Sequence, residues 1–454
     1  MKKIISVLLT GAMLLGATAS VPLSASAVTT NIVESGATYA DEYGSWTYEL
    51  VDYGKSCLIT GYDKSMPDIE IPSSINGLPV VALNGTFEYC SELTSVTIPN
   101  SVTYIGERTF AYCESLTSVT MSDNVTIIDA LAFYGCDSLI NITMPDKLTT
   151  IGKYAFGECD SLTTIAIPKD VTTIDDNAFD YCNSLTDIEV SKDNAIYSSI
   201  DGVLLNKKQS ELICYPNGKT SDSYTIPDGV TTIGYCAFAS CRNLTSITIP
   251  NGVTTIGNNA FFDCSNLTRV TIPNSVTTID RNAFYNCSSL TSITIPNGVT
   301  TIGEGAFCAC GSLTSVEIPN SVTAIGEGVF SLCGGLTSVT IPNSVTIIDD
   351  SAFRFCDNIC DVYYTGTESE WNGVSIGDDN GSLANATVHY NYVPPVRGDV
   401  NGDGEISIVD VIYVLKYTID DSELTAEKLA VADLNGDKEI TVLDAILMQK
   451  IILQ

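Results

Sequence analysis

Apolar and polar positions alternate along most of this chain in a unit of 23 residues, of which GVTTIGEGAFCACGSLTSVEIPN (298–320) is one copy. Within this copy, Leu313, Val316 and Ile318 are separated by Thr, Ser and Glu, which predicts a short strand with one buried face. Pro319 ends the strand, because proline has no N–H to donate to a neighbouring strand. The pattern therefore predicts one short strand per unit, with its apolar side turned into the coil.

The rest of each unit turns the chain back to its starting point. Residues 322–325 predict a second short extended segment, and GVFSLC (328–333), which usually reads xAFxxC, predicts a single helical turn that inserts its Phe. Self-similarity at a period of about 20–50 residues is typical of a solenoid, in which neighbouring coils bury each other's apolar faces. We therefore expect a repeat solenoid of short parallel strands with single helical turns.

A cysteine recurs at one position of eleven units, and a Phe stands three residues before each of them. Sixteen cysteines in an exported chain would usually indicate disulfides. In a solenoid, however, equivalent side chains stack about 4.8 Å apart, and a free Cys packs well as a small hydrophobic residue. We therefore predict a row of packed thiols rather than a ladder of disulfides. The cysteines of this row are Cys90, Cys113, Cys136, Cys159, Cys182, Cys241, Cys264, Cys287, Cys310, Cys333 and Cys356. The others, for which the sequence suggests no pairing, are Cys57, Cys214, Cys236, Cys308 and Cys360.

The row of cysteines is interrupted between Cys182 and Cys241, where 36 extra residues stand. The strand-like segments GVLLN and ELICYP flank a polar turn, which predicts a β-hairpin insert at about 192–223. Such an insert is either a binding feature or a tolerated loop, and the sequence leaves both readings open.

Segments of other composition flank the repeats, which we expect to occupy residues 89–360. The strand-like WTYEL and SCLITGY lie on either side of a D-Y-G turn, which predicts a hairpin inside an N-terminal cap at 28–88. Residues 1–27 combine a lysine pair, an apolar run too short for a membrane anchor and an Ala-Ser-Ala cleavage site, which is typical of a signal peptide. No later apolar run is long enough to span a bilayer, so we expect export without membrane insertion.

The charge balance narrows the possible partners. Lys and Arg total 21 against 54 Asp and Glu, for a net charge of −33, so the chain should repel nucleic acid and anionic membrane surfaces. A single His nearly excludes catalysis by paired or metal-bound histidines. Aromatic residues one or two positions before the cysteine row form either an exposed binding edge or packing between coils. They are Tyr89, Tyr112, Tyr134, Tyr181, Phe262, Tyr285 and Phe355.

The unit as a whole, L-x-x-[IV]-x-I-P-x-x-V-x-x-I-x-x-x-A-F-x-x-C, resembles the BspA-type bacterial leucine-rich repeat family. The resemblance covers about 89–360, and residues 361–392 are similar to the C-terminal cap of that family. It implies a curved solenoid, export or display on a surface, and adhesion or ligand binding rather than catalysis.

A short proline-containing linker, 393–397, leads to two loops of matching pattern, 399–410 and 433–444. Calcium takes six to eight oxygen ligands, and oxygen-bearing residues at positions 1, 3, 5, 7, 9 and 12 of a loop wrap around one ion. Each loop should therefore hold one calcium ion, with position 7 contributing its backbone carbonyl. The expected ligands are Asp399, Asn401, Asp403, Glu405, Ser407 and Asp410 in the first loop, and Asp433, Asn435, Asp437, Glu439, Thr441 and Asp444 in the second.

Both loops carry Asp at position 12, where an EF-hand has Glu, and each precedes one apolar-periodic helix, at 411–419 and 445–453. Two such loop-helix units resemble a type I dockerin, over 398–454. The resemblance implies a small all-α calcium-binding domain and a cohesin module of a scaffold protein as its partner. By the family pattern, the residues that contact the cohesin are Ile408, Val409, Leu415, Lys416, Val442, Leu443, Gln449 and Lys450.

The second loop departs from the calcium pattern at position 6, where it has Lys438 in place of the Gly404 of the first loop. That position requires a sharp turn, and a non-glycine residue with positive φ costs about 1 kcal/mol. We therefore predict that the second loop binds calcium more weakly than the first.

Together the two resemblances imply a secreted, non-catalytic binding or adhesion component of a cellulosome, associated with polysaccharide degradation. The repeats would meet an unknown protein or polysaccharide ligand. The alternatives are a cellulosomal enzyme of the glycoside hydrolase type, which would need a fixed pair of carboxylates, and a structural spacer without a ligand.

Overall fold

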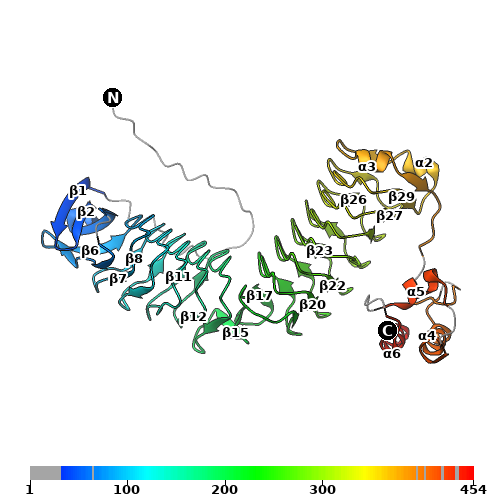
Figure 1. Ribbon diagram of the computed structural model, residues 1–454, viewed down its shortest axis with the longest axis horizontal. Helices are drawn as coiled ribbons and strands as arrows, with labels where there is room; N and C mark the ends of the chain where they lie inside the picture. The colour runs from blue at the N-terminus through cyan, green and yellow to red at the C-terminus, as the bar shows by residue number, and fades with distance from the viewer. Residues whose placement is uncertain are drawn as a thin grey trace.

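A computed structural model describes residues 32–63, 66–394, 397–402, 405–420, 424–434 and 439–453 of this chain. Stacked coils form a long arc, and a small helical domain follows the last coil (Figure 1). The signal peptide expected at 1–27 lies outside the described residues. Within them, no helix is both long and apolar enough to cross a bilayer.

The L-x-x-V-x-I segment of most coils forms the predicted short strand, and the strands of neighbouring coils pair in parallel with a shift of one repeat. In the pair β25–β27, for example, Val316 lies opposite Val339. Both residues are buried, whereas the polar residues beside them face outward. These strands are β4 (Asp68–Glu70), β7 (Ser95–Thr97), β9 (Ser118–Thr120), β12 (Thr164–Ile167), β14 (Asp187–Val190), β18 (Ser223–Thr225), β20 (Ser246–Thr248), β22 (Arg269–Thr271), β25 (Ser315–Glu317), β27 (Ser338–Ile341), β29 (Asp361–Tyr364) and β31 (Thr387–His389).

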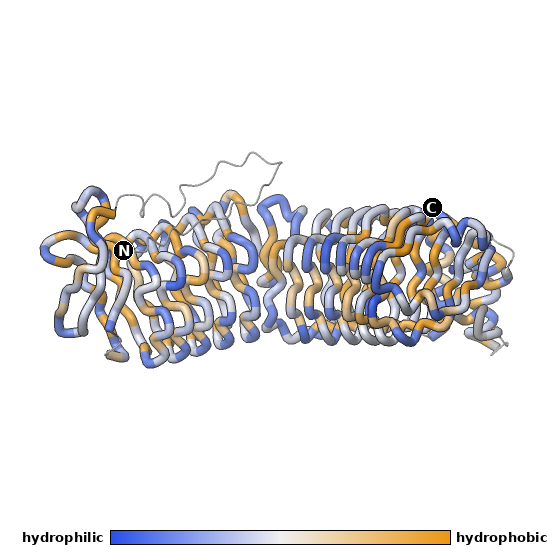
Figure 2. Tube along the Cα trace, turned by 90° about the horizontal axis from the view of Figure 1, so that it is seen from above, coloured by the Kyte–Doolittle hydropathy of each residue, from blue (hydrophilic) through white to orange (hydrophobic). Residues whose placement is uncertain are grey.

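The V-x-x-I segment forms a second row of very short parallel strands. Ile279 of one coil lies opposite Ile302 of the next. These strands are β8 (Tyr104–Ile105), β10 (Ile127–Ile128), β11 (Thr150–Ile151), β13 (Thr173–Ile174), β19 (Thr232–Ile233), β21 (Thr255–Ile256), β23 (Thr278–Ile279), β24 (Thr301–Ile302), β26 (Ala324–Ile325), β28 (Ile347–Ile348) and β30 (Ser375–Ile376). Because every coil repeats the pattern, hydrophobic and hydrophilic stretches recur at matching places along the arc (Figure 2).

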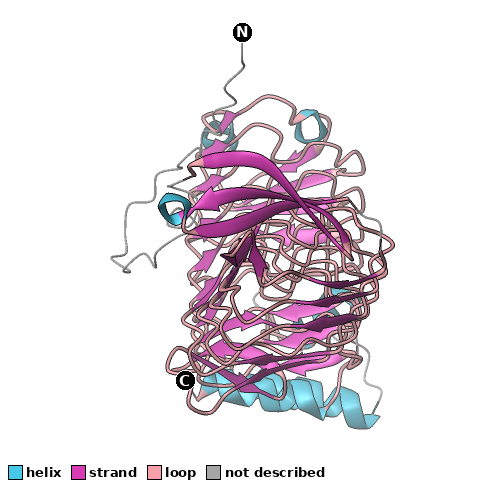
Figure 3. Ribbon diagram, turned by 90° about the vertical axis from the view of Figure 1, so that its left-hand side faces the viewer, coloured by secondary structure: helices cyan, strands magenta, loops and turns pink. Residues whose placement is uncertain are grey.

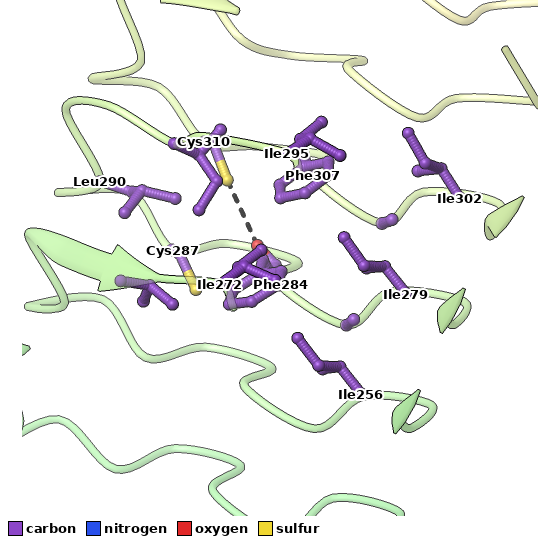
Figure 4. Packing of buried hydrophobic residues seen from close by; sticks show 14 of the residues in the cluster. Ile256, Ile272, Ile279, Phe284, Cys287, Leu290, Ile295, Ile302, Phe307 and Cys310 are labelled. Carbon is purple, nitrogen blue, oxygen red and sulfur yellow. Dashed lines mark hydrogen bonds between the residues drawn. The ribbon is translucent and has the colours of Figure 1, made fainter. Parts of the chain in front are cut away.

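Rows of identical side chains fill the interior. Phe284 stacks on Phe307 of the next coil, with ring centroids 5.3 Å apart, and both rings are fully buried (Figure 4). The Cys310 thiol donates a hydrogen bond of 3.3 Å to the carbonyl oxygen of Phe284. The structure describes all sixteen cysteines, and none of them forms a disulfide; the eleven of the row are buried, so the predicted row of packed thiols is confirmed. Burial raises the pKa of Cys264 to about 12, which keeps its thiol protonated and unreactive.

Repeated threonines outside the core form hydrogen bonds between neighbouring coils. The hydroxyl of Thr254 donates to the carbonyl oxygen of Thr231 at 3.3 Å, and the hydroxyl of Thr277 donates to that of Thr254 at the same distance. The A-F-x-x-C segment closes each coil with i→i+3 turns, such as the bond from the Cys310 N–H to the Phe307 carbonyl. The single helical turn expected there is therefore a tighter, 3₁₀-like turn.

The N-terminal end of the arc is covered by three long antiparallel strands, β1 to β3, which Figure 3 shows across the near end of the coils. Strands β2 and β3 pair on either side of η1, which confirms the predicted hairpin, and β1 adds a strand that the sequence pattern did not reveal. Trp46 of β2 is fully buried and packs against Phe87 at the start of the Phe row. The elements are β1 (Glu34–Asp41), β2 (Gly44–Val51), η1 (Asp52–Gly54), β3 (Ser56–Tyr62), β5 (Ser74–Ile75) and β6 (Leu78–Leu83).

The 36 extra residues form three strands that join the solenoid instead of projecting from it. Strand β15 (Tyr197–Ile200) pairs antiparallel with β16 (Val203–Asn206), which pairs antiparallel with β17 (Glu211–Cys214). Strand β17 then pairs in parallel with β19, so the row of short strands resumes. The insert lies where the two halves of the arc meet (Figure 1).

Short helices occur at the C-terminal end of the solenoid and in the domain that follows it. Helix α2 begins with a capping box, in which Thr367 and Glu370 satisfy each other's backbone N–H groups. In the C-terminal domain, the helix between the two loop-helix units is one that the sequence analysis did not predict. The helices are α2 (Glu368–Trp371), α3 (Gly381–Ala384), α4 (Ile408–Asp420), α5 (Ala426–Ala432) and α6 (Val442–Ile452).

Candidate calcium loops and partner-binding helices

The two position-12 aspartates lie at the first turn of α4 and α6, and each ties its loop to its helix. Asp410 is fully buried and accepts hydrogen bonds from the N–H groups of Asn401 (3.0 Å) and Ser407 (2.8 Å). The Ser407 hydroxyl donates a third bond, of 3.1 Å, to the same carboxylate. The side chain that begins the helix therefore also holds the loop in its curved shape.

The second loop repeats this arrangement. Asp444 is fully buried, and its carboxylate accepts bonds of 2.9 Å from the N–H groups of Leu434 and Thr441. The Thr441 hydroxyl caps the helix by accepting from the Leu443 N–H, and it also donates to Asp444 at 3.3 Å. Because a buried carboxylate is costly unless it is paired or coordinates a metal, both residues suit a cation site.

The other expected ligands are only partly placed. Asp399 is 8% exposed and accepts a bond of 2.6 Å from the N–H of Gly402, inside the first loop. Asn401, Glu405, Asp433 and Glu439 are also described, whereas the residues expected at positions 3 and 5 of the second loop and at position 5 of the first lie outside the described residues. Among described side chains alone, no three Asp, Glu, His or Cys groups form a metal site. The donor set is nevertheless made of hard oxygen ligands, which fits calcium.

Helices α4 and α6 pack against each other through one face and leave apolar residues on another. Their shared core contains Val411 and Val414 of α4, with Ala445 and Met448 of α6. The residues at loop positions 10 and 11 point away from this core. These four residues, Ile408, Val409, Val442 and Leu443, are exposed. Further apolar residues of both helices are also 39% or more exposed: Ile412, Tyr413, Ile419, Ile446, Ile451 and Ile452. The fold of the domain therefore leaves several apolar side chains of both helices in contact with solvent, among them the four at positions 10 and 11.

The remaining residues expected to contact the partner differ in exposure. Lys416, Gln449 and Lys450 are exposed, whereas Leu415 is half-buried and packs against the shared helix core. Leu415 therefore serves the fold of the domain as well as the surface that a partner would meet.

Arg397 links this domain to the solenoid, which the sequence analysis did not predict. One guanidinium nitrogen donates to the Thr294 hydroxyl on the outer strand face of the solenoid at 2.8 Å. The other donates to the backbone carbonyl of Asp433, the first residue of the second loop, at 2.7 Å. No local signal marks this contact, because its two ends are 103 residues apart in the chain.

The aromatic residues before the cysteine row are exposed or half-buried, and several stack on each other. Tyr89 is 61% and Phe355 53% exposed. The rings of Tyr89 and Tyr112 stack at 4.9 Å, and those of Phe262 and Tyr285 stack at 5.0 Å. Each stacked ring covers one face of its neighbour, so these two pairs offer fewer open ring faces than separate aromatic residues would.

Comparison with known proteins agrees with this architecture. The family described as BspA type leucine-rich repeat region matches residues 83–200, 213–310 and 277–373, and the family described as dockerin type I domain matches residues 397–453. No curated protein matches the chain.

Solved structures of bacterial repeat proteins align with the solenoid. A leucine-rich repeat protein from Eubacterium ventriosum is 25% identical, with a TM-score of 0.55, and the alignment covers 81% of this chain and 100% of that one. The pneumococcal vaccine antigen PcpA is 18% identical, with a TM-score of 0.56, over 80% and 100% of the two chains. A leucine-rich cell surface protein from Faecalibacterium prausnitzii is 28% identical, with a TM-score of 0.48, over 75% and 98%.

The stacked coils and the paired loop-helix units define a leucine-rich repeat solenoid joined to a dockerin. The chain belongs to the family of proteins with a BspA-type leucine-rich repeat region, which matches more than half of its length, and it ends in a type I dockerin domain. Type I dockerins bind calcium and indicate attachment to a cellulosome through a cohesin. Both parts are typical of extracellular cellulosome or cell-surface proteins.

Proposed function

We propose that this chain is a secreted, non-catalytic binding or adhesion component, held on a cellulosome scaffold by calcium-dependent binding of its dockerin to a cohesin module. The main support is the pair of buried position-12 carboxylates, each beside exposed apolar residues at positions 10 and 11 of the same loop. In this role the solenoid contributes to polysaccharide degradation by meeting a substrate or a surface, while other proteins of the scaffold carry out the hydrolysis.

In this proposal the dockerin holds two calcium ions, one in each loop, through the twelve ligands expected from the sequence. Calcium supplies the positive charge that the buried Asp410 and Asp444 carboxylates require. Each carboxylate accepts hydrogen bonds from backbone N–H groups of its own loop, which supports this role. Because a metal ion adds its binding free energy to folding, calcium would also set the stability of both helices.

The cohesin surface in this proposal includes Ile408 and Val409 at the start of α4, and Val442 and Leu443 at the start of α6. They are 57%, 44%, 54% and 50% exposed. Burying four such side chains supplies an apolar contact, so the interface would be more hydrophobic than one built on polar residues. Lys416, Gln449 and Lys450 would form its polar rim.

Cohesin pull-down with the full chain tests the anchoring role. Binding should be lost on chelation by EDTA, and lost when Asp399→Ala and Asp433→Ala are combined. If cohesin binding survives both treatments, the anchoring role is wrong.

Surface variants then locate the interface. Ile408→Ser with Val409→Ser, and Val442→Ser with Leu443→Ser, should each weaken cohesin binding by about tenfold or more. Ile419→Ser is the matched control, because Ile419 is an exposed apolar residue of the same helix α4 but lies away from loop positions 10 and 11. Equal effects of the control and the other variants would contradict this interface.

Pull-down of polysaccharides by the chain after deletion of its dockerin separates the solenoid's role from that of the dockerin. Retention without release of reducing sugar supports binding without catalysis. Release of reducing sugar would instead support the glycoside hydrolase alternative, and absence of any ligand would support the spacer.

A further inference from the structure

Arg397 stands where the linker ends and the dockerin begins, and its backbone is held by the dockerin. The N–H of the next residue, Gly398, donates to the Val431 carbonyl at 2.8 Å, and Val431 belongs to the core of the dockerin. Gly398 has φ of +96°, and a Cβ there would lie 3.2 Å from the Ile406 side chain, so this close approach requires glycine. The side chain of Arg397 therefore extends from a fixed point of the dockerin.

The guanidinium of Arg397 bridges the two parts of the molecule. It donates to the Thr294 hydroxyl of the solenoid at 2.8 Å and to the Asp433 carbonyl of the dockerin at 2.7 Å. Arginine carries donors on separate nitrogens of one planar group, so it can bond both parts at once. Figure 1 shows the dockerin on the side of the arc where β22 and β27 lie, which is the side of the outer strand face.

The solenoid carries a negative charge beside Thr294. Glu317 occupies the position of Thr294 in the next coil, whereas the coils before and after this pair have Thr271 and Thr340 there. Desolvation raises the pKa of the Glu317 carboxyl, and the Arg397 guanidinium acts in the opposite direction. The two charges therefore attract each other. The one acidic residue at this position in the second half of the arc thus lies next to the threonine that Arg397 contacts.

The coil that Arg397 contacts is held less tightly than the coil before it. Residues 291–295, all of them described, lie outside the strands, and an isolated bridge at Thr294 pairs them with the previous coil. The Thr291 N–H lies 3.5 Å from the Thr268 carbonyl oxygen, whereas the matching bond one coil earlier measures 2.9 Å. Amide exchange in this coil should therefore respond to a contact from the dockerin.

We propose that the outer strand face at Thr294 and Glu317 is a docking surface for the chain's own dockerin, held there by Arg397. Docking fixes the direction in which the solenoid leaves its anchor. The dockerin side of the contact is the backbone carbonyl of Asp433, so docking depends on the folded shape of the second loop. Asp433 is also an expected calcium ligand of that loop. Calcium loading and docking should therefore strengthen each other, because coupling between two sites is reciprocal.

Small-angle X-ray scattering and amide hydrogen exchange of the full chain in calcium chloride test the docking. Wild-type scattering should fit one position of the dockerin, whereas that of Arg397→Ala should fit only a mixture of positions. Amides of residues 291–295 should exchange about tenfold faster in Arg397→Ala, because a hydrogen bond from a charged group to this coil is lost. Identical scattering and equal exchange in the two proteins would overturn the docking.

Matched variants on the solenoid locate the contact. Thr294→Val should release the dockerin, whereas Thr271→Val, at the same exposed position of the previous coil, should scatter like wild type. Glu317→Gln should also favour release, whereas Glu189→Gln, at the same position in the first half of the arc, should not. Equal behaviour within both pairs would show that the dockerin does not dock at this surface.

Chelation and calorimetry test the coupling to calcium. EDTA should give wild-type protein the scattering of Arg397→Ala. Titration of Arg397→Ala with calcium should show one of the two sites weakened by about fivefold or more. Wild-type scattering that EDTA leaves unchanged, or equal calcium affinities of the two proteins, would overturn the coupling.

The coupling to calcium rests on the proposed calcium sites, whereas the docking does not. Cohesin pull-down keeps the docking apart from the anchoring role. Arg397→Ala should retain full cohesin binding, because Arg397 is not among the residues expected to contact the cohesin. Wild-type protein that fails to bind a cohesin but releases its dockerin in Arg397→Ala would contradict the anchoring role and support the docking.

Discussion

Replacing Asp410 by alanine removes the side chain that joins the first loop to α4. The carboxylate is fully buried and accepts three hydrogen bonds, from Asn401 N–H, Ser407 N–H and the Ser407 hydroxyl, at 2.8–3.1 Å. A donor left without its partner costs about 1–3 kcal/mol when it is buried, and the two backbone N–H groups that lose theirs in Asp410→Ala are part-buried. We therefore expect a loss of about 2–4 kcal/mol, which is a large fraction of the stability of a domain of this size.

Amide hydrogen exchange of the full chain measures this effect where it occurs, because each peptide reports the free energy of its own opening. In Asp410→Ala, residues 405–420 should lose protection with calcium present, while the solenoid strands keep theirs. Ser407→Ala is the control that removes only the hydroxyl bond, and it should cost about 1 kcal/mol. If α4 of Asp410→Ala exchanges at the wild-type rate with and without calcium, the carboxylate does not have the structural role argued for it.

Three further predictions concern the core, the carboxyl of Asp180 and the second loop. Phe284→Ala leaves a cavity at a fully buried site and removes two ring stacks. Urea unfolding should therefore show a loss of about 3–5 kcal/mol in the free energy of unfolding, and Phe284→Leu should lose less. Similar losses for both variants would contradict the stacked row. The folded-state pKa of Asp180 is raised to about 7, above its unfolded value of about 3.9, so its charging destabilises the fold as pH rises between these values. Asp180→Asn should therefore be more stable than wild type above pH ~7, by at most about 4 kcal/mol, and this difference in stability should vanish near pH ~4. Thermal melts at both pH values measure it. A difference that stays constant with pH would refute the burial argument. Calcium calorimetry should resolve a weaker site in the loop with Lys438 than in the loop with Gly404, and two equal sites would show that position 6 does not decide affinity.

Much of the solenoid could be predicted from the sequence, because each coil meets neighbours of the same sequence. The spacing of Leu313, Val316 and Ile318 in one unit predicts which side chains are buried. It also predicts their contacts, because the equivalent residues of the next coil, 23 positions later, pack beside them. The cysteine row could be predicted for the same reason, because residues at the same position of successive units stack on each other. The two loops of the dockerin could be recognised for a related reason: their expected ligands lie within twelve consecutive residues, so spacing alone predicts the donor set.

Elements without such a local pattern were missed. Strand β1 is mostly exposed and pairs only with β2, so it carries no strong apolar alternation. Helix α5, seven residues long, lies in a stretch with no loop motif. The contact of Arg397 with Thr294 depends on how the last domain lies against the solenoid, which no spacing in the chain records.

The sequence by itself determined that this protein is a stack of like coils followed by a dockerin with two loop-helix units, because both properties follow from short, repeated spacings. It also showed where the repeat is interrupted, but not which structure the inserted residues form. Only the tertiary structure decided that the inserted strands join the sheet of the solenoid, and that Arg397 of the dockerin meets the outer strand face at Thr294. The reason is physical: the insert falls outside the repeat, and Arg397 and Thr294 are 103 residues apart, so no regular spacing records either contact.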